Sequence, residues 1–293
     1  MDYAIRALLT ELIDYAGLFP PAALDMATAV YNYAAYRQSE HNWMLARFVV
    51  PVARLGEFES ASAGLLPQDK PWQLSALLGN DWQNDFVCIA AFNERHTGRA
   101  VIDTVEVKAE SAVQIETLRQ ALPAGLTAYV EIPIKGDSAA WIAALAQAGL
   151  YAKGRMGGVT AEAFPSTSEI ARFIAACVNA EVPFKASAGL HHPLRGEYRL
   201  TYATDSATAT MHGFLNVFLA AAFAQNGLAV EQLIEVLEER SPSTIQFESG
   251  RVVWRGEELV RGQLVNARHL AALAFGSCSF TEPLEDLQKL GLL

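Results

Sequence analysis

The feature that most constrains the fold of this chain is a repeated alternation of short apolar runs with helical stretches, beginning near residue 46. The runs are apolar on both faces, which is typical of parallel strands that helices cover on both sides. The expected strands are Arg47–Val52, Gln73–Leu78, Thr104–Lys108, Thr127–Ile132, Tyr151–Arg155 and Pro183–Ser187. The expected helices are Trp82–Phe92, Ala112–Leu122, Ser138–Ala148 and Ser166–Ala180. Because no break interrupts the repeats, a single TIM-like (β/α)8 barrel over residues 1–293 is favoured over an open doubly wound sheet.

The N-terminal part of the chain does not follow this alternation. Tyr3–Ile13 and Leu24–Tyr36 have helical periodicity, so residues 1–45 are expected to form helices that pack on the barrel. Two prolines between them cannot continue a helix, which predicts a loop over Asp14–Pro21.

The last third is less regular. His191–Thr210 has too little periodicity to predict an element, and Thr244–Val260 is expected to be a hairpin that turns near Ser249-Gly250. The expected helices here are Met211–Asn226, Val230–Glu239 and Leu264–Ala274. Phe275–Phe280 is a candidate for the last barrel strand, and the seventh strand is not identifiable.

Composition excludes several classes of function. The net charge of −10 argues against nucleic-acid binding, which needs clustered cations. The longest apolar run, Phe214–Phe223, is too short to cross a bilayer, and the N-terminus lacks the features of a signal peptide. Cys88, Cys177 and Cys278 are widely spaced and match no metal-binding motif. We expect a cytoplasmic protein with no nucleic-acid or membrane partner; its oligomeric state, including a homo-oligomer, stays open.

Ionisable residues recur where the expected strands end, which is where parallel barrels carry their chemistry. In chain order the strand ends deliver Glu106 and Lys108, then Glu131, then Lys153 and Arg155, then Lys185 and Ser187, followed by His191 and His192. A single charged residue at a strand end is commonly just a solvated edge residue. Recurrence on four successive strands favours a functional site at one end of the barrel.

Two of these residues are lysines with apolar neighbours in the sequence. Burial among apolar groups removes water from an ammonium ion, so the pKa falls and the amine can attack a carbonyl. Phe184-Lys185-Ala186 and Tyr151-Ala152-Lys153 both offer such flanks, and each lysine would lower the pKa of the other by charge repulsion. Either lysine is therefore a candidate nucleophile.

The other parts of such a site are also present. Glu131 and His191 are candidates for proton transfer, and Arg155 is a candidate for binding an anion. Gly157-Gly158 is consistent with an anion-binding nest, although paired glycines alone usually form a turn. Further candidates for substrate contacts are Lys108, Glu106, Ser187, His192, Asp14 and Ser277. Together these residues favour a lyase or isomerase that acts on a small anionic carbonyl metabolite through a lysine Schiff base, without a cofactor or metal.

Two other functions stay open. A non-catalytic barrel could bind an anionic ligand through the same basic residues, with ligand-induced stabilisation and no turnover. His191 and His192, with Glu131, could instead serve a metal-dependent barrel enzyme, although neither HxH nor HExxH spacing occurs.

Two segments resemble a known family. Tyr151–Gly158, the helix after it and Val182–Gly189 look like the two lysine strands of deoxyribose-phosphate aldolase, a class I aldolase family. The two preceding strands of that family are matched by Ile102–Val107 and Tyr129–Ile132. The resemblance implies an α/β barrel in which Lys153 forms the Schiff base and Lys185 perturbs the pKa of Lys153.

Most of the chain also resembles a bacterial family of α/β-barrel proteins of similar length. The shared phrases are Ile13–Ala22, Phe184–Pro193 and Phe275–Phe280. This resemblance implies the fold and brings no activity with it.

Overall fold

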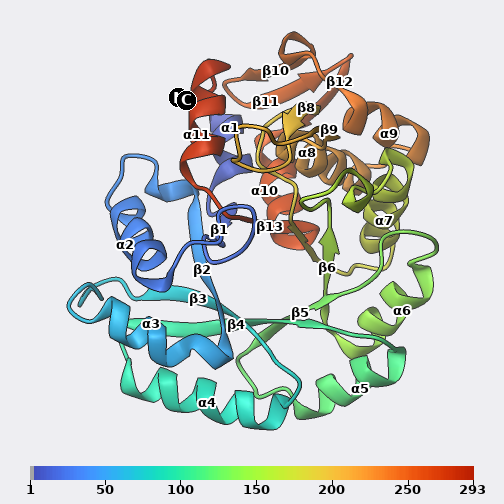
Figure 1. The fold of residues 1–293 in the computed structure, drawn as a ribbon. Coiled ribbons are helices and arrows are strands. Elements are labelled where there is room, and N and C mark those ends of the chain that lie inside the picture. The colour runs from blue at the N-terminus through green and yellow to red at the C-terminus, as the bar shows by residue number, and fades with distance from the viewer. Residues whose placement is uncertain (1–2) are drawn as a thin grey trace.

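The computed structural model describes residues 3–293, and its centre is a closed barrel of parallel strands (Figure 1). Around the barrel the strands follow chain order from β1 to β7, and β13 closes it between β7 and β1. Their bounds are β1 Ile13–Tyr15, β2 Leu45–Pro51, β3 Trp72–Leu77, β4 Ala100–Lys108, β5 Thr127–Glu131, β6 Tyr151–Arg155, β7 Phe184–Ser187 and β13 Ala272–Ser277. The predicted (β/α)8 barrel is confirmed.

Helices cover the outside of the barrel (Figure 1). Their bounds are α1 Tyr3–Leu9, α2 Met26–Arg37, α3 Leu55–Ser62, α4 Trp82–Arg95, α5 Ala112–Ala121, α6 Ala139–Ala148, α7 Thr167–Asn179, α8 Phe214–Gln225, α9 Val230–Glu238, α10 Arg261–Leu270 and α11 Thr281–Lys289. Helix α7 shows how the sequence sets such an element. Ser166 and Glu169 form a capping box at its start, and Ile170, Phe173 and Ile174 are buried on one face.

The first barrel strand lies where a helix end and a loop were expected. β1 pairs with β2 on one side and with β13 on the other, so the predictions of a helix through Ile13 and a loop from Asp14 are wrong. All three residues of β1 are buried, and a run this short has no periodicity to detect. The strand that the prediction lacked is therefore the first of the barrel. The last strand begins at Ala272, inside the helix expected over Leu264–Ala274.

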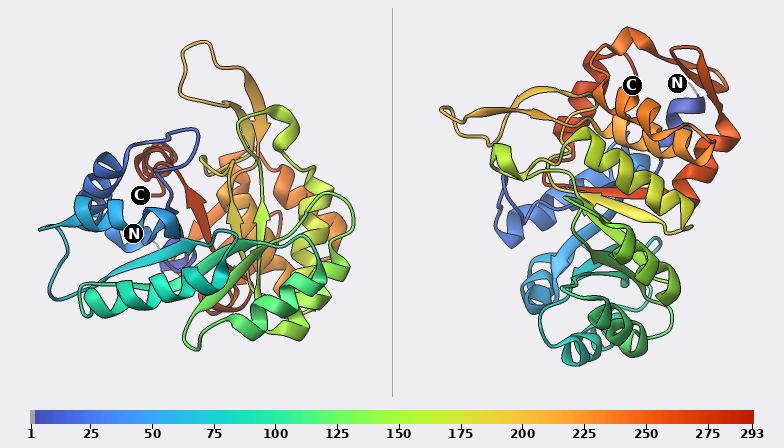
Figure 2. Two further views of the ribbon diagram at one scale, coloured as in Figure 1. Left: turned by 60° about the horizontal axis from the view of Figure 1, so that its bottom comes forward. Right: turned by 90° about the vertical axis from the view of Figure 1, so that its right-hand side faces the viewer.

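Between β7 and β13 in the sequence, the chain forms two small antiparallel sheets outside the barrel. The first is the hairpin of β8 (Gly196–Arg199) and β9 (Thr208–Met211), which extends away from the barrel in both views of Figure 2. The second has three strands, β10 Ile245–Glu248, β11 Arg251–Trp254 and β12 Glu257–Val260. The hairpin predicted near Ser249-Gly250 is confirmed as β10–β11, while β12 and α11 were not predicted.

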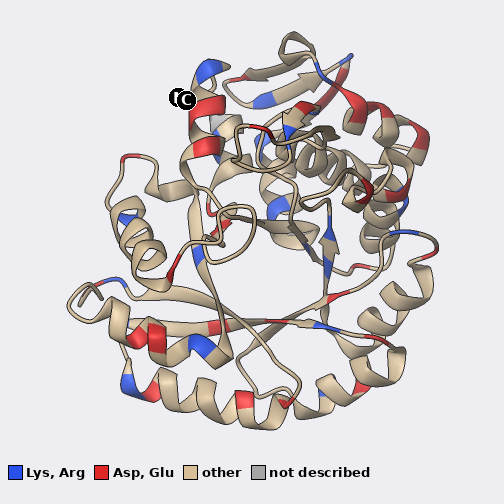
Figure 3. Ribbon diagram, viewed as in Figure 1, with Lys and Arg blue, Asp and Glu red and all other residues tan. Residues whose placement is uncertain are grey.

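Charged residues occur on the barrel strands as well as on the outer helices (Figure 3). Within residues 3–293 no helix is both long enough and apolar enough to span a membrane. Cys88, Cys177 and Cys278 are all free thiols.

Candidate active site

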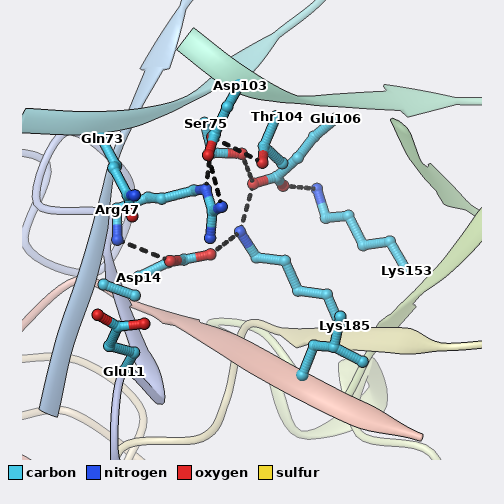
Figure 4. A network of polar contacts seen from close by, with 12 residues as sticks. Glu11, Asp14, Arg47, Gln73, Ser75, Asp103, Thr104, Glu106, Lys153 and Lys185 are labelled. Carbon is cyan, nitrogen blue, oxygen red and sulfur yellow. Dashed lines mark hydrogen bonds and ion pairs between the residues drawn. The ribbon is translucent and has the colours of Figure 1, made fainter. Parts of the chain in front are cut away.

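The barrel interior contains a line of alternating charges, which we call the interior ladder (Figure 4). Its members, in order, are Asp103, Arg47, Asp14, Lys185, Glu106, Lys153 and Glu131. Arg47 joins Asp103 through two guanidinium hydrogen bonds of 2.8 Å, and its backbone N–H donates to Asp14 at 2.9 Å. The ladder thus runs from the half-buried ion pair of Arg47 and Asp103 to the carboxyl ends of the strands.

Lys185 lies at the centre of the ladder and is only 1% exposed. Its Nζ donates to Asp14 Oδ2 and to Glu106 Oε1, each at 2.5 Å. Burial alone would lower the pKa of Lys185, but the two carboxylates outweigh burial and raise the pKa above its ordinary value. Lys185 is therefore held as an ammonium ion.

The predicted effect of apolar neighbours on Lys185 is thus wrong. Successive residues of a strand face opposite sides, so Phe184 lies against Phe173 of helix α7 while Lys185 faces the barrel interior. Apolar flanks in the sequence do not describe what surrounds a strand residue in the fold.

Glu106 joins the two lysines and is 3% exposed. Besides Lys185, it binds Lys153 Nζ at 2.9 Å and accepts a 2.7 Å hydrogen bond from Ser75 Oγ. Burial would raise the pKa of Glu106, but the two ammonium groups outweigh it and hold the pKa well below the usual range. Glu106 is a permanent carboxylate at neutral pH.

Lys153 occupies the open end of the ladder. Its Nζ lies 2.9 Å from Glu106 Oε2 and 3.1 Å from Glu131 Oε2, and its side chain is 10% exposed, against 1% for Lys185. This exposed part faces a cavity of about 310 Å³ that Lys153 helps to line. Lys153 is therefore the lysine that a bound molecule meets most directly.

The cavity lies at the carboxyl ends of the barrel strands. Of the residues predicted from the sequence it is lined by Glu106, Glu131, Lys153, Arg155, Gly158, Lys185, Ser187 and His191. The loop between β1 and α2 adds Phe19, Pro20 and Pro21, and the end of β13 adds Gly276 and Cys278. The structure thus brings the four predicted strand ends together around one space.

Three predicted residues lie away from the cavity wall. Asp14 is buried and forms an ion pair with Lys185, which does line the cavity. Ser277 is buried, and its hydroxyl donates to the Ser279 carbonyl at 2.6 Å. Lys108 is exposed at the end of β4.

Gly157 and His192 also lie outside this lining. A Cβ on Gly157 would come within 2.3 Å of the Phe164 ring, so this glycine is required by packing rather than by an anion. The His192 ring stacks on Tyr198 at 3.5 Å, and its Nδ1 lies 2.6 Å from Asp286.

Arg155 and Gly158 both line the cavity, and a Cβ on Gly158 would lie 4.0 Å from Arg155 Nη2. No carboxylate among residues 3–293 lies within ion-pair distance of its guanidinium, whereas Arg47, Arg54 and Arg95 each have one. An unpaired guanidinium beside a cavity suits an anionic ligand.

A second polar group, which we call the mouth cluster, consists of His191, Tyr202, Cys278 and Glu282. Of these, sequence reasoning predicted His191 as a site residue and missed Tyr202 and Glu282. His191 Nδ1 lies 3.3 Å from Glu282 Oε2 and 4.0 Å from Cys278 Sγ. Burial lowers the pKa of His191, but Cys278 and Glu282 outweigh it and raise the pKa to about 9. One pattern could have indicated Glu282, because it follows Ser279 by three residues, a spacing typical of helix starts.

Within residues 3–293, no group of three or more His, Cys, Asp or Glu side chains is arranged to hold a metal ion. In comparisons with known proteins, no family model and no curated protein matches the chain. The two family resemblances therefore stay predictions.

Proposed function

We propose that the protein is a lyase or isomerase of the class I aldolase type, acting on a small anionic carbonyl compound, with Lys153 as the amine that forms the Schiff base. The observation that carries the proposal is the position of Lys153 Nζ, held between Glu106 and Glu131 on the cavity wall. Lys185 is unsuited to attack because two carboxylates hold it as a buried ammonium ion. This division of roles is the one that the aldolase resemblance implies.

Glu131 is the group best placed to prepare the amine. In the proposed sequence, the Lys153 ammonium gives a proton to Glu131, and the neutral amine adds to the carbonyl carbon to give a carbinolamine. The protonated Glu131 then returns its proton to the carbinolamine hydroxyl, which leaves as water. The products of this stage are an iminium ion on Lys153 and an ionised Glu131.

The iminium ion then acts as an electron sink. In a lyase, the β-hydroxyl group gives its proton to a base, the bond between the α and β carbons breaks, and its electron pair moves into the iminium system. The products are a released carbonyl fragment and an enamine, which takes up a proton at the α carbon and becomes an iminium ion again. In an isomerase, an α proton leaves instead and returns at a different carbon. Addition of water regenerates the carbonyl and the amine, with Glu131 and His191 as the proton-transfer groups.

Arg155 supports an anionic substrate. Its guanidinium has no carboxylate partner within residues 3–293 and lies at the rim of the cavity that Lys153 lines. Lys185 and His191, whose pKa values are raised, add two further cations to the lining. A chain with a net charge of −10 thereby presents a locally basic site to its substrate.

Borohydride trapping tests the proposal. The protein is incubated with small phosphorylated or carboxylated aldehydes and ketones, reduced, and weighed intact by mass spectrometry. We expect one adduct per chain in the wild type, none in Lys153→Met, and an unchanged yield in Lys70→Met, which removes an exposed lysine. Thermal stabilisation by a compound that leaves no adduct would remove the Schiff-base mechanism and favour a non-catalytic anion-binding barrel.

A further inference from the structure

His191 stands where two spaces meet. It lines the cavity that contains Lys153, and it also lines a second cleft of about 310 Å³ on the outer side. The outer cleft is bounded by the β8–β9 hairpin, from Tyr198 to Tyr202, and by Glu282 of helix α11. A proton on His191 can therefore reach a molecule that occupies the cavity.

The two ring nitrogens of His191 have different surroundings. Nδ1 faces Glu282 Oε2 at 3.3 Å and Cys278 Sγ at 4.0 Å. Nε2 has no hydrogen-bond partner within residues 3–293, although the side chain is only 11% exposed. A carboxylate that accepts a hydrogen bond from the Nδ1–H group fixes the orientation of the ring and leaves Nε2 free to contact a ligand.

Glu282 is itself held in place by other residues. Tyr202 donates to Glu282 Oε2 at 3.1 Å, and the backbone N–H of Glu282 donates to Ser279 Oγ at 3.1 Å. Glu282 lies in the first turn of α11, where the helix dipole favours a negative charge. Burial would raise the pKa of Glu282, but His191 outweighs it and the pKa is lowered, so Glu282 is ionised.

We propose that Glu282, supported by Tyr202, is a positioning residue that holds His191 as the general acid of the cavity. When the carbon–carbon bond forms, Nε2 gives its proton to the new alkoxide oxygen, and His191 becomes a neutral imidazole that keeps its Nδ1 proton and points it at the Glu282 carboxylate. When that bond breaks, Nε2 takes the hydroxyl proton back. This inference rests on the proposed lyase function and names a residue that the aldolase resemblance does not supply.

Titratable and charged groups face His191 from several elements. The β13 end, the hairpin, helix α11, its own loop and the cavity wall contribute Cys278, Tyr202, Glu282, His192, Lys153, Lys185, Arg155, Glu106 and Glu131. The cations of the wall disfavour protonation of His191, so its charge depends on the partners at Nδ1. Of these, Cys278 and Glu282 both raise the pKa of His191, and Glu282 Oε2 is the nearer, at 3.3 Å.

The test compares Glu282→Gln with Glu285→Gln, which makes the same change of charge at an exposed position of the same helix. The protonation of the His191 ring is followed by NMR titration. Its NMR signal is identified as the one that is missing from the spectrum of His191→Gln. We expect a pKa of about 9 in the wild type and in Glu285→Gln. In Glu282→Gln, which retains Cys278, we expect the pKa to fall toward the ordinary value of about 6.5.

Turnover as a function of pH is the second readout. At pH 8 the rate of carbon–carbon bond formation, which needs protonated His191, is expected to fall by up to roughly thirty-fold in Glu282→Gln, the limit set by a pKa drop of about 2.5 units. Near pH 5.5 the rate is expected to match the wild type. A loss of equal size at every pH would assign Glu282 a purely structural role and overturn the inference.

The two proposals fail in different ways. A His191 pKa near 6.5 in the wild type overturns the role of Glu282, whatever borohydride trapping shows. An absent adduct together with a His191 pKa that moves in Glu282→Gln overturns the Schiff-base function and retains the coupling of Glu282 to His191. The NMR titration needs no substrate, so it separates the two cases.

Discussion

The interior ladder and the mouth cluster are both built from paired charges, but they respond to pH differently. In the ladder, the pKa of Lys185 is raised above 10.5 and that of Glu106 is lowered below 4.5, so both stay charged across the neutral range. In the mouth cluster, His191 titrates at about 9. A buried group that contacts two groups of the opposite charge, as Lys185 and Glu106 each do, keeps its own charge. A histidine with one carboxylate partner at the rim of the cavity can gain and lose its proton. The ladder thus fixes the local field, and the mouth cluster can move protons.

Removal of the central cation should produce the largest effect. Lys185→Met leaves the buried carboxylates of Asp14 and Glu106 without their shared partner, which is expected to cost about 3–5 kcal/mol of unfolding free energy. Urea denaturation at pH 7 measures this cost, with Lys70→Met as a control that should change stability by less than about 0.5 kcal/mol. Adding Asp14→Asn to Lys185→Met should recover part of the loss. A cost below about 1 kcal/mol would show that the ladder is not a buried, mutually dependent unit.

A rise of pH above neutral should reduce the contribution of the mouth cluster to the unfolding free energy and leave that of the ladder unchanged. Because the pKa of His191 is raised from 6.5 to about 9 on folding, its stabilising contribution is complete below pH 6.5 and is lost as pH rises through 9. The unfolding free energy of the wild type, minus that of His191→Gln, should therefore fall by on the order of 2–3 kcal/mol over this range. A difference that stays constant from pH 6.5 to 9 would contradict the account.

The outer end of the ladder should matter less than its centre. Arg47 and Asp103 have side chains 26% and 31% exposed, so water screens their attraction. Arg47→Met is expected to cost about 1 kcal/mol in the same urea experiment, well below Lys185→Met. Equal losses of unfolding free energy in the two variants would mean that burial does not determine how much each ion pair of the ladder stabilises the fold.

The smallest effect is expected at the hairpin. Tyr202→Phe removes the hydrogen bond to Glu282 and keeps the ring, which should cost about 0.5 kcal/mol because Tyr202 is exposed. The pKa of His191 should fall in this variant, but less than in Glu282→Gln, because the carboxylate remains. A larger fall of the pKa in Tyr202→Phe than in Glu282→Gln would reverse the roles assigned to these residues.

The barrel and much of its mouth could be predicted because both follow from local patterns. Strands apolar on both faces mark a parallel sheet, and their carboxyl ends meet, so Glu106, Glu131, Lys153 and Lys185 were expected at one site. The pairing within the site could not be read in this way. The raised pKa of Lys185 depends on Asp14, which lies in a three-residue strand at the other end of the sequence.

The mouth cluster depends on contacts between segments far apart in the chain. Tyr202 lies in a hairpin whose sequence has little periodicity, and Glu282 lies in a C-terminal helix that was not predicted. Each residue taken alone is an ordinary surface position. Only the fold brings them within hydrogen-bond distance of one another and of His191.

Peptide mapping of the borohydride-reduced protein tests the central claim most directly, because it identifies the lysine that carries the adduct. The account predicts the added mass on the peptide that contains Lys153 and none on the peptide that contains Lys185. An adduct on Lys185 would contradict the claim that the interior ladder holds this residue as a permanent ammonium ion.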